Sequence, residues 1–221
     1  MRTSRRGRGH SLLIKITGEL LDSPVILCFI EKMRSQADRV SILVGGGTQI
    51  NEELRRVFPG YRMVKRIGGR YHGDYPTEIK TAMDRVAYRV LIQNREDLLT
   101  RLAAAGIKDV VVMIPVIQDK AGVLCHVDGD IYATGNACNG YDRIIIVTYN
   151  EATKTEKLVT LAPWIESYPG KFEILSPADI TALAEIDAPT LPASQKPPAS
   201  PPPPLRPRRT TSHKPVTPVV S

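Results

Sequence analysis

Two glycine-rich turns and one lysine are the residues of this sequence whose types and spacing best suit the binding of a ligand. Each turn follows a short apolar run, at residues 12–16 and 40–44, and each precedes a segment with helical character. A strand that leads through such a turn into a helix directs backbone N–H groups at the helix N-terminus, where an anion binds favourably. With Lys15 inside the first run, the two units predict a phosphate-handling site on a parallel sheet. Neither unit matches the Walker A or the dinucleotide-binding motif.

The two turns resemble those of the amino-acid kinase family. Members of that family open on a Lys-x-Gly-Gly motif and continue with a Gly-Gly-Gly turn, which here occupies residues 45–47. The similarity is greatest to the acetylglutamate kinases, in residues 19–22 and 47–52, and it continues through Gly69 and Arg70 to residues 125–130. It covers roughly residues 12–186. The resemblance implies an ATP-dependent small-molecule kinase that phosphorylates a carboxylate, of the kind found in amino-acid or arginine biosynthesis.

The resemblance assigns catalysis to Lys15 and Asp130. Phosphoryl transfer needs positive and donor groups around the moving phosphoryl, and the ammonium of Lys15 would lie over the phosphate oxygens. Asp130 would orient the catalytic lysines. The nucleotide would contact Lys15, Thr17 and Gly18, although the family has a second glycine where Thr17 stands. The implied cofactor is ATP, and Mg²⁺ would arrive with it, so that no metal site made of protein side chains alone is expected.

Four further residues match the family's positions for the substrate. Gly46 and Gly47 would offer N–H groups to the phosphoryl group or to the accepting carboxylate. Arg70 would grip the substrate's carboxylate, since a guanidinium forms two parallel hydrogen bonds with it. His126 stands where acetylglutamate kinases have an asparagine, and it could donate one hydrogen bond to the substrate.

One large departure from the family keeps two alternatives open. The family closes with a segment that bears a second catalytic lysine, and this sequence has no equivalent of it. Lys154, Lys157 or Lys171 could take that place, but no motif selects one of them. The chain could therefore be a degenerate member that binds a ligand or a partner without turnover. A uridylate kinase-like enzyme is the other alternative, because Gly18 and Glu19 also occur in that relative's opening motif.

Alternating apolar segments predict how these residues are positioned. The expected strands are 12–16, 40–44, 110–117 and 143–149, and the expected helices are 24–36, 49–57, 76–105 and 177–185. Strands that are apolar throughout suit a sheet covered on both faces. The sequence therefore predicts a three-layer α/β sandwich with a mainly parallel sheet.

The charge of the chain is concentrated in its ends. The net charge is +7, yet four arginines among residues 1–8 and five basic residues after 188 leave about −2 over residues 9–188. We expect a basic disordered arm at 1–11, one folded domain at 12–187, and a proline-rich disordered tail at 188–221. Nucleic acid would bind only non-specifically, through these ends.

Three unpaired cysteines and the lack of a long apolar run favour a cytoplasmic protein with no membrane contact. We also expect a small-molecule substrate and a homo-oligomer.

Overall fold

The computed structural model describes residues 10–62, 64–66, 69–71, 75–118, 124–136 and 140–185. All of them lie in the first of the two units into which the chain divides, Met1–Ala188. The expected basic arm, apart from its last two residues, and the expected proline-rich tail lie outside the described residues, so their disorder stays a prediction. Among the described residues, no helix has the length and apolar character that a membrane span requires.

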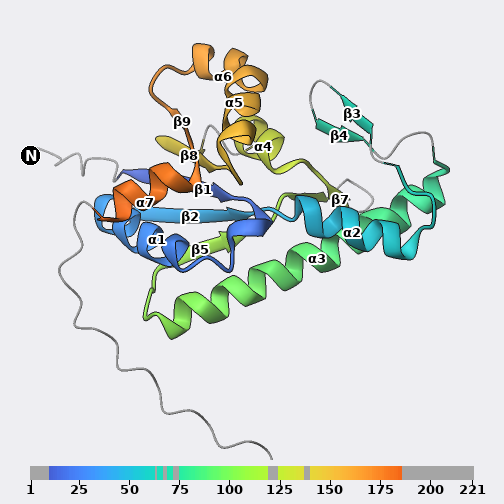
Figure 1. Ribbon diagram of the computed structural model, residues 1–221, viewed down its shortest axis with the longest axis horizontal. Coiled ribbons are helices and arrows are strands. Elements are labelled where there is room, and N and C mark those ends of the chain that lie inside the picture. Colours follow the sequence, from blue (N-terminus) through green and yellow to red (C-terminus); the bar gives the residue numbers. More distant parts are fainter. Residues whose placement is uncertain are drawn as a thin grey trace, which may run out of the picture. The chain divides into compact units, whose positions relative to one another are not determined.

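A five-stranded parallel sheet with the order β5-β2-β1-β8-β9 forms the centre of this unit (Figure 1). The strands are β1 (Ser11–Ile16), β2 (Arg39–Val44), β5 (Val110–Met113), β8 (Arg143–Val147) and β9 (Phe172–Leu175). In the middle of the sheet, Leu12 of β1 lies opposite Val40 on one side and Arg143 on the other. The expected α/β sandwich with a parallel sheet is confirmed.

Helices cover both faces of the sheet because successive strand side chains point to opposite sides. Leu12, Ile14 and Ile16 pack into a cluster with α1 (Pro24–Gln36), α7 (Pro177–Glu185) and the C-terminal part of α3 (Thr77–Ala104). Leu13 points the other way, into a cluster with Trp164 of α6 (Ala162–Ser167) and with Leu161, which joins α6 to α5 (Glu151–Thr160). All four of these β1 residues are almost fully buried. The long apolar strands therefore have the two covered faces that their composition predicts.

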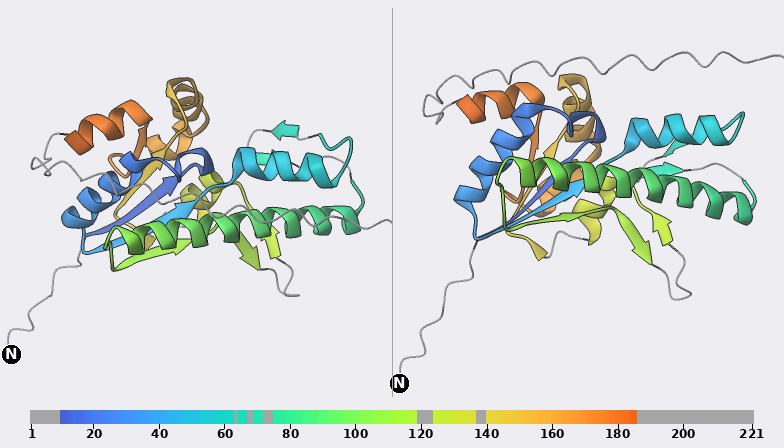
Figure 2. Two further views of the ribbon diagram at one scale, coloured as in Figure 1. Left: turned by 60° about the horizontal axis from the view of Figure 1, so that its bottom comes forward. Right: turned by 90° about the horizontal axis from the view of Figure 1, so that it is seen from below.

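A helix pair extends the unit beyond the sheet. Figure 2 shows α2 (Gly47–Val57) beside the N-terminal part of α3 in both of its views. A separate apolar cluster joins the two helices, with Leu54 from α2 and Met83 and Leu91 from α3 fully buried in it. Two antiparallel hairpins form sheets of their own. One, between α2 and α3, pairs β3 (Val64–Arg66) with β4 (Gly69–Tyr71), and the other, after β5, pairs β6 (Val116–Gln118) with β7 (Leu124–His126).

The expected strand at 110–117 is wrong in its extent. The structure divides it at Ile114 and Pro115 into β5, which belongs to the sheet, and β6, which forms the hairpin with β7. Proline has no N–H group to give to a ladder, so a strand that continues through it would lose a hydrogen bond. Instead the backbone N–H of Val116 donates to the carbonyl oxygen of Ile114 at 2.9 Å, and the chain leaves the sheet.

Candidate functional site

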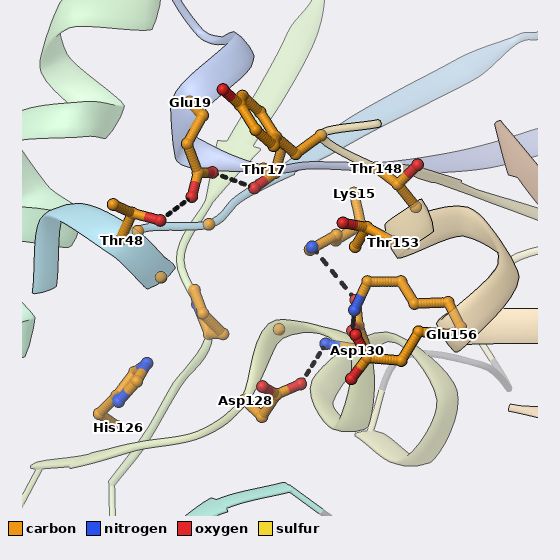
Figure 3. A pocket seen from close by; sticks show the side chains of 17 residues that line it. Lys15, Thr17, Glu19, Thr48, His126, Asp128, Asp130, Thr148, Thr153 and Glu156 are labelled. Carbon is orange, nitrogen blue, oxygen red and sulfur yellow. Dashed lines mark hydrogen bonds and ion pairs between the residues drawn. The ribbon is translucent and has the colours of Figure 1, made fainter. Parts of the chain in front are cut away.

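A cavity of about 230 Å³ lies where the C-terminal ends of three strands meet. Thr17, Gly45 and Thr148, which follow β1, β2 and β8, all line it, together with residues of α4 (Gly129–Ile131) and of α5. Parallel strands bring their carboxyl ends to one edge, which is where open α/β sheets bind ligands. Figure 3 shows the side chains around this cavity.

Two lysines converge on one carboxylate in the cavity wall. Lys15 Nζ lies 3.1 Å from Asp130 Oδ1, and Lys157 from α5 donates to the other carboxylate oxygen. Lys15 and Asp130 are only 7% and 8% exposed. Burial alone would raise the pKa of Asp130, but the charges of Lys15 and Lys157 and their hydrogen bonds lower it to about 2. The three residues, called the Lys15–Asp130–Lys157 triad from here on, therefore carry a net charge of +1.

The turn before Asp130 fixes its position. The Asp128 carboxylate caps α4, because its Oδ1 accepts from the backbone N–H of Asp130 at 2.9 Å and of Ile131 at 3.5 Å. A Cβ atom on Gly129 would lie 3.2 Å from Cε of Lys15, so the glycine leaves room for the lysine side chain. The Asp-Gly-Asp turn thus positions Asp130 and leaves room for Lys15 to reach it. No group of three or more His, Cys, Asp or Glu side chains that could hold a metal lies among the described residues.

A second carboxylate faces the same cavity from η1 (Gly18–Leu20). The Glu19 side chain accepts hydrogen bonds from the hydroxyl groups of Thr17 and of Thr48, the second residue of α2. Burial would raise the pKa of Glu19, but these two hydroxyl donors and more weakly the charge of Lys15 lower it below its ordinary value. Glu19 is therefore ionised at neutral pH.

Two amide side chains hold the glycine turns together. Asn94 of α3 donates from Nδ2 to the carbonyl oxygen of Gly45 at 2.9 Å and to Gln49 Oε1 at 3.2 Å. Gln49 in turn donates from Nε2 to the carbonyl oxygen of Gly18 at 3.2 Å. A Cβ atom on Gly18 would lie 2.0 Å from Gln49 Oε1 and 3.0 Å from the Gly45 oxygen. Gly18 is thus required for the close approach of the two turns.

Gly18→Ala is expected to lower the free energy of unfolding by about 1–2 kcal/mol. The new methyl group displaces the Gln49 amide and with it the hydrogen bonds that join the two turns, each worth about 1 kcal/mol. Urea unfolding followed by circular dichroism measures the change. Gly140→Ala is the control, because a Cβ atom there meets nothing within 4 Å. Equal effects of the two substitutions would contradict the steric role of Gly18.

The structure brings most of the predicted site residues to this cavity. Those that line it are Lys15, Thr17, Gly46, Gly47, His126 and Asp130. Gly18 does not join them in the described part of the wall and packs against Gln49. Arg70 lies in β4, but its side chain is outside the described residues, so its predicted grip on a carboxylate stays a prediction. The ligand roles of the others likewise stay predictions.

Lys157 is the site residue that the sequence could not single out. Of the three candidate lysines, Lys154 instead lies 2.6 Å from Asp179, and Lys171 lies over the ring of Tyr168 at 5.6 Å. The available signal was Asn150, whose side chain accepts from the backbone N–H of Thr153 at 2.8 Å and caps α5. A helix that starts there places Thr153 and Lys157 on one face, one turn apart, and both line the cavity.

Comparison with known proteins supports the fold. No protein-family model matches this sequence, and no curated protein matches it significantly. Among solved structures, the chain is similar to smu.665 from Streptococcus mutans UA159, with a TM-score of 0.56 and 15% identity over 75% of this chain and 94% of that one. It is also similar to N-acetylglutamate synthase from Neisseria gonorrhoeae, solved with coenzyme A and L-arginine, with a TM-score of 0.51 and 12% identity. That match covers 79% of this chain and only 58% of the synthase.

The kinase function expected from the resemblance is wrong on this comparison. The N-acetylglutamate synthase is an acetyltransferase and not a kinase, so neither a carboxylate-phosphorylating enzyme nor the related alternatives receive support from it. At 12–15% identity, the two neighbours establish only a shared α/β fold. Because one fold hosts many functions, the residues of the cavity rather than the fold indicate what this protein does.

Proposed function

We propose that this protein binds a small molecule through a negatively charged group, which contacts Lys15 and Lys157 at the carboxyl edge of the sheet. The convergence of these two lysines on Asp130 carries the proposal. One carboxylate balances only one of the two ammonium groups, so the triad itself keeps a positive charge. Hydrogen bonds from an ammonium to a phosphate or carboxylate are among the stronger ones in proteins.

The size of the cavity limits what enters it. Its volume of about 230 Å³ is below the range of roughly 300–1,000 Å³ that is usual for drug-sized ligands. The site therefore suits a small molecule, or the charged end of a larger one whose remainder lies outside. Binding of ATP with Mg²⁺ stays a prediction, and the cavity could hold only the charged phosphate end of ATP while the rest of the nucleotide lies outside. A homo-oligomeric state and a cytoplasmic location stay predictions as well.

Titration calorimetry on the full chain tests the proposal. The probes are inorganic phosphate, ATP with Mg²⁺, and the two ligands of the synthase structure, coenzyme A and L-arginine. We expect at least one of them to bind with a dissociation constant below about 1 mM. Lys157→Ala should weaken that binding at least 10-fold, because a hydrogen bond to a charged group contributes about 1.5–3 kcal/mol.

Lys154→Ala is the matched control for that substitution. Both lysines lie on α5, both pair with an aspartate, and their side chains are 23% and 20% exposed. Lys154 contacts Asp179 rather than the cavity, so its loss should change the dissociation constant by less than twofold. Equal losses in the two variants, or no binding of any probe at 10 mM, would refute the proposed site.

A further inference from the structure

Glu19 places a negative charge in the same cavity as the two lysines. Within the described part of the chain, its carboxylate accepts hydrogen bonds from the hydroxyls of Thr17 and Thr48 and from its own backbone N–H, all of them neutral groups (Figure 3). These contacts fix the position of the carboxylate without cancelling its charge. Asp128 and Glu156 line the cavity too, so the lining contains several carboxylates beside the positive triad.

The position of Glu19 also affects where a ligand's anion can go. The start of α2 at Gly46–Thr48 would otherwise attract an anion, since a helix N-terminus carries a partial positive charge. The Glu19 carboxylate already lies there, hydrogen-bonded to the first turn through Thr48. A second anion at this place would meet like-charge repulsion. The anion of the ligand is therefore directed to Lys15 and Lys157, and the region beside Glu19 favours a cation.

We propose that Glu19 recognises a positively charged group of the ligand, so that the ligand is a small zwitterion with an ammonium group beside its phosphate or carboxylate. This inference rests on the proposed function and adds the chemical class of the ligand. Burial, the two hydroxyls and the charge of Lys15 together set the pKa of Glu19. Lys15 and Glu19 line the same cavity of about 230 Å³, so one small molecule inside it can contact both charges.

Two probes that differ only in an ammonium group test the inference. We compare ethyl phosphate with phosphoethanolamine by titration calorimetry on the full chain, in the presence of EDTA. Phosphoethanolamine is expected to bind at least 10-fold more tightly, because its ammonium group pairs with Glu19 while its phosphate contacts the lysines. Equal dissociation constants would overturn the inference.

Glu19→Gln separates recognition of the cation from a purely structural role. Glutamine keeps the size of the side chain but removes the charge. Its amide oxygen can accept from one threonine hydroxyl, and its amide N–H can donate to the oxygen of the other. We expect phosphoethanolamine to bind at least 10-fold more weakly and ethyl phosphate to bind as tightly as before or more tightly. Loss of both ligands to the same extent would contradict the inference. Glu151→Gln, at the exposed start of α5, is the control and should leave both constants unchanged.

The remaining outcomes separate the two proposals. If inorganic phosphate binds and depends on Lys157 but the paired probes are not distinguished, the inference fails and the proposed function stands. If none of the anions binds, both fail. The titrations are repeated with Mg²⁺ in place of EDTA. If ethyl phosphate then binds as tightly as phosphoethanolamine, a metal ion supplies the positive charge and the ammonium group is not what Glu19 recognises.

Discussion

Asp130→Asn is expected to lower the free energy of unfolding by about 3–5 kcal/mol, which is the usual cost of removing one partner from a buried ion pair. The substitution keeps the shape of the side chain but removes the carboxylate charge that both Lys15 and Lys157 contact. Their side chains are only 9% and 20% exposed, so water can replace little of what is lost. Urea unfolding measures the change, and the melting temperature should fall by roughly 10 °C.

Two further variants make that result specific. Asp97→Asn changes an exposed carboxylate that accepts from Gln93 at 2.8 Å on the surface of α3, and it should cost less than about 0.5 kcal/mol. Adding Lys157→Met to Asp130→Asn should restore part of the lost stability, because it removes one of the two repelling charges. Simple additivity of the two substitutions would show that the triad is not energetically coupled.

Stability is also expected to fall steeply in acid. Burial raises the pKa of Asp130, but the two lysines lower it to about 2, well below its ordinary value of 3.8. A carboxylate with a lowered pKa stabilises the fold above its unfolded pKa, and the contribution disappears as the pH falls through the folded pKa. The free energy of unfolding should therefore decrease by about 2 kcal/mol between pH 5 and pH 2 from this residue. Glu19 and Asp179, whose pKa values are also lowered, add to the same trend.

Urea unfolding at a series of pH values measures this loss. The Asp130→Asn variant should show a clearly shallower decrease between pH 4 and pH 2, since it has no carboxylate to protonate at that position. The Asp97→Asn variant should follow the unchanged protein. An identical pH profile for Asp130→Asn and the unchanged chain would mean that the triad does not hold Asp130 in its charged form.

The sheet and its main helices could be predicted from the sequence because their signals are local. β1 and β2 are short apolar runs that end at glycine turns, and α3 has a regular apolar stripe, so observed and expected bounds differ by one or two residues. The resemblance to a known family correctly selected two residues of the cavity wall, Lys15 and Asp130, because both lie in short sequence motifs. Its fold was right and its function was wrong, since one fold hosts many chemistries.

The part of the chain from 151 to 175 could not be predicted because it lacks such signals. None of the residues of α5 is fully buried, so the helix has no apolar stripe to reveal it. β9 is a four-residue edge strand with a charged residue, Glu173, inside it. Lys157 was missed for this reason, since its role depends on a helix that apolar periodicity does not show. The contact of Glu19 with Thr48 could not be predicted either, because it joins residues that are 29 positions apart.

The position of β1 in the middle of the sheet has a consequence for how the protein is made. β1 pairs on one side with β2, which follows soon after η1 and α1. On the other side it pairs with β8, where Leu12 and its partner Arg143 are 131 residues apart. A ribosome adds about 5–20 residues per second, so one edge of this apolar strand stays unpaired for on the order of 10 s during synthesis. An open apolar edge can pair with another chain, so the nascent protein passes through an aggregation-prone interval that ends when β8 emerges.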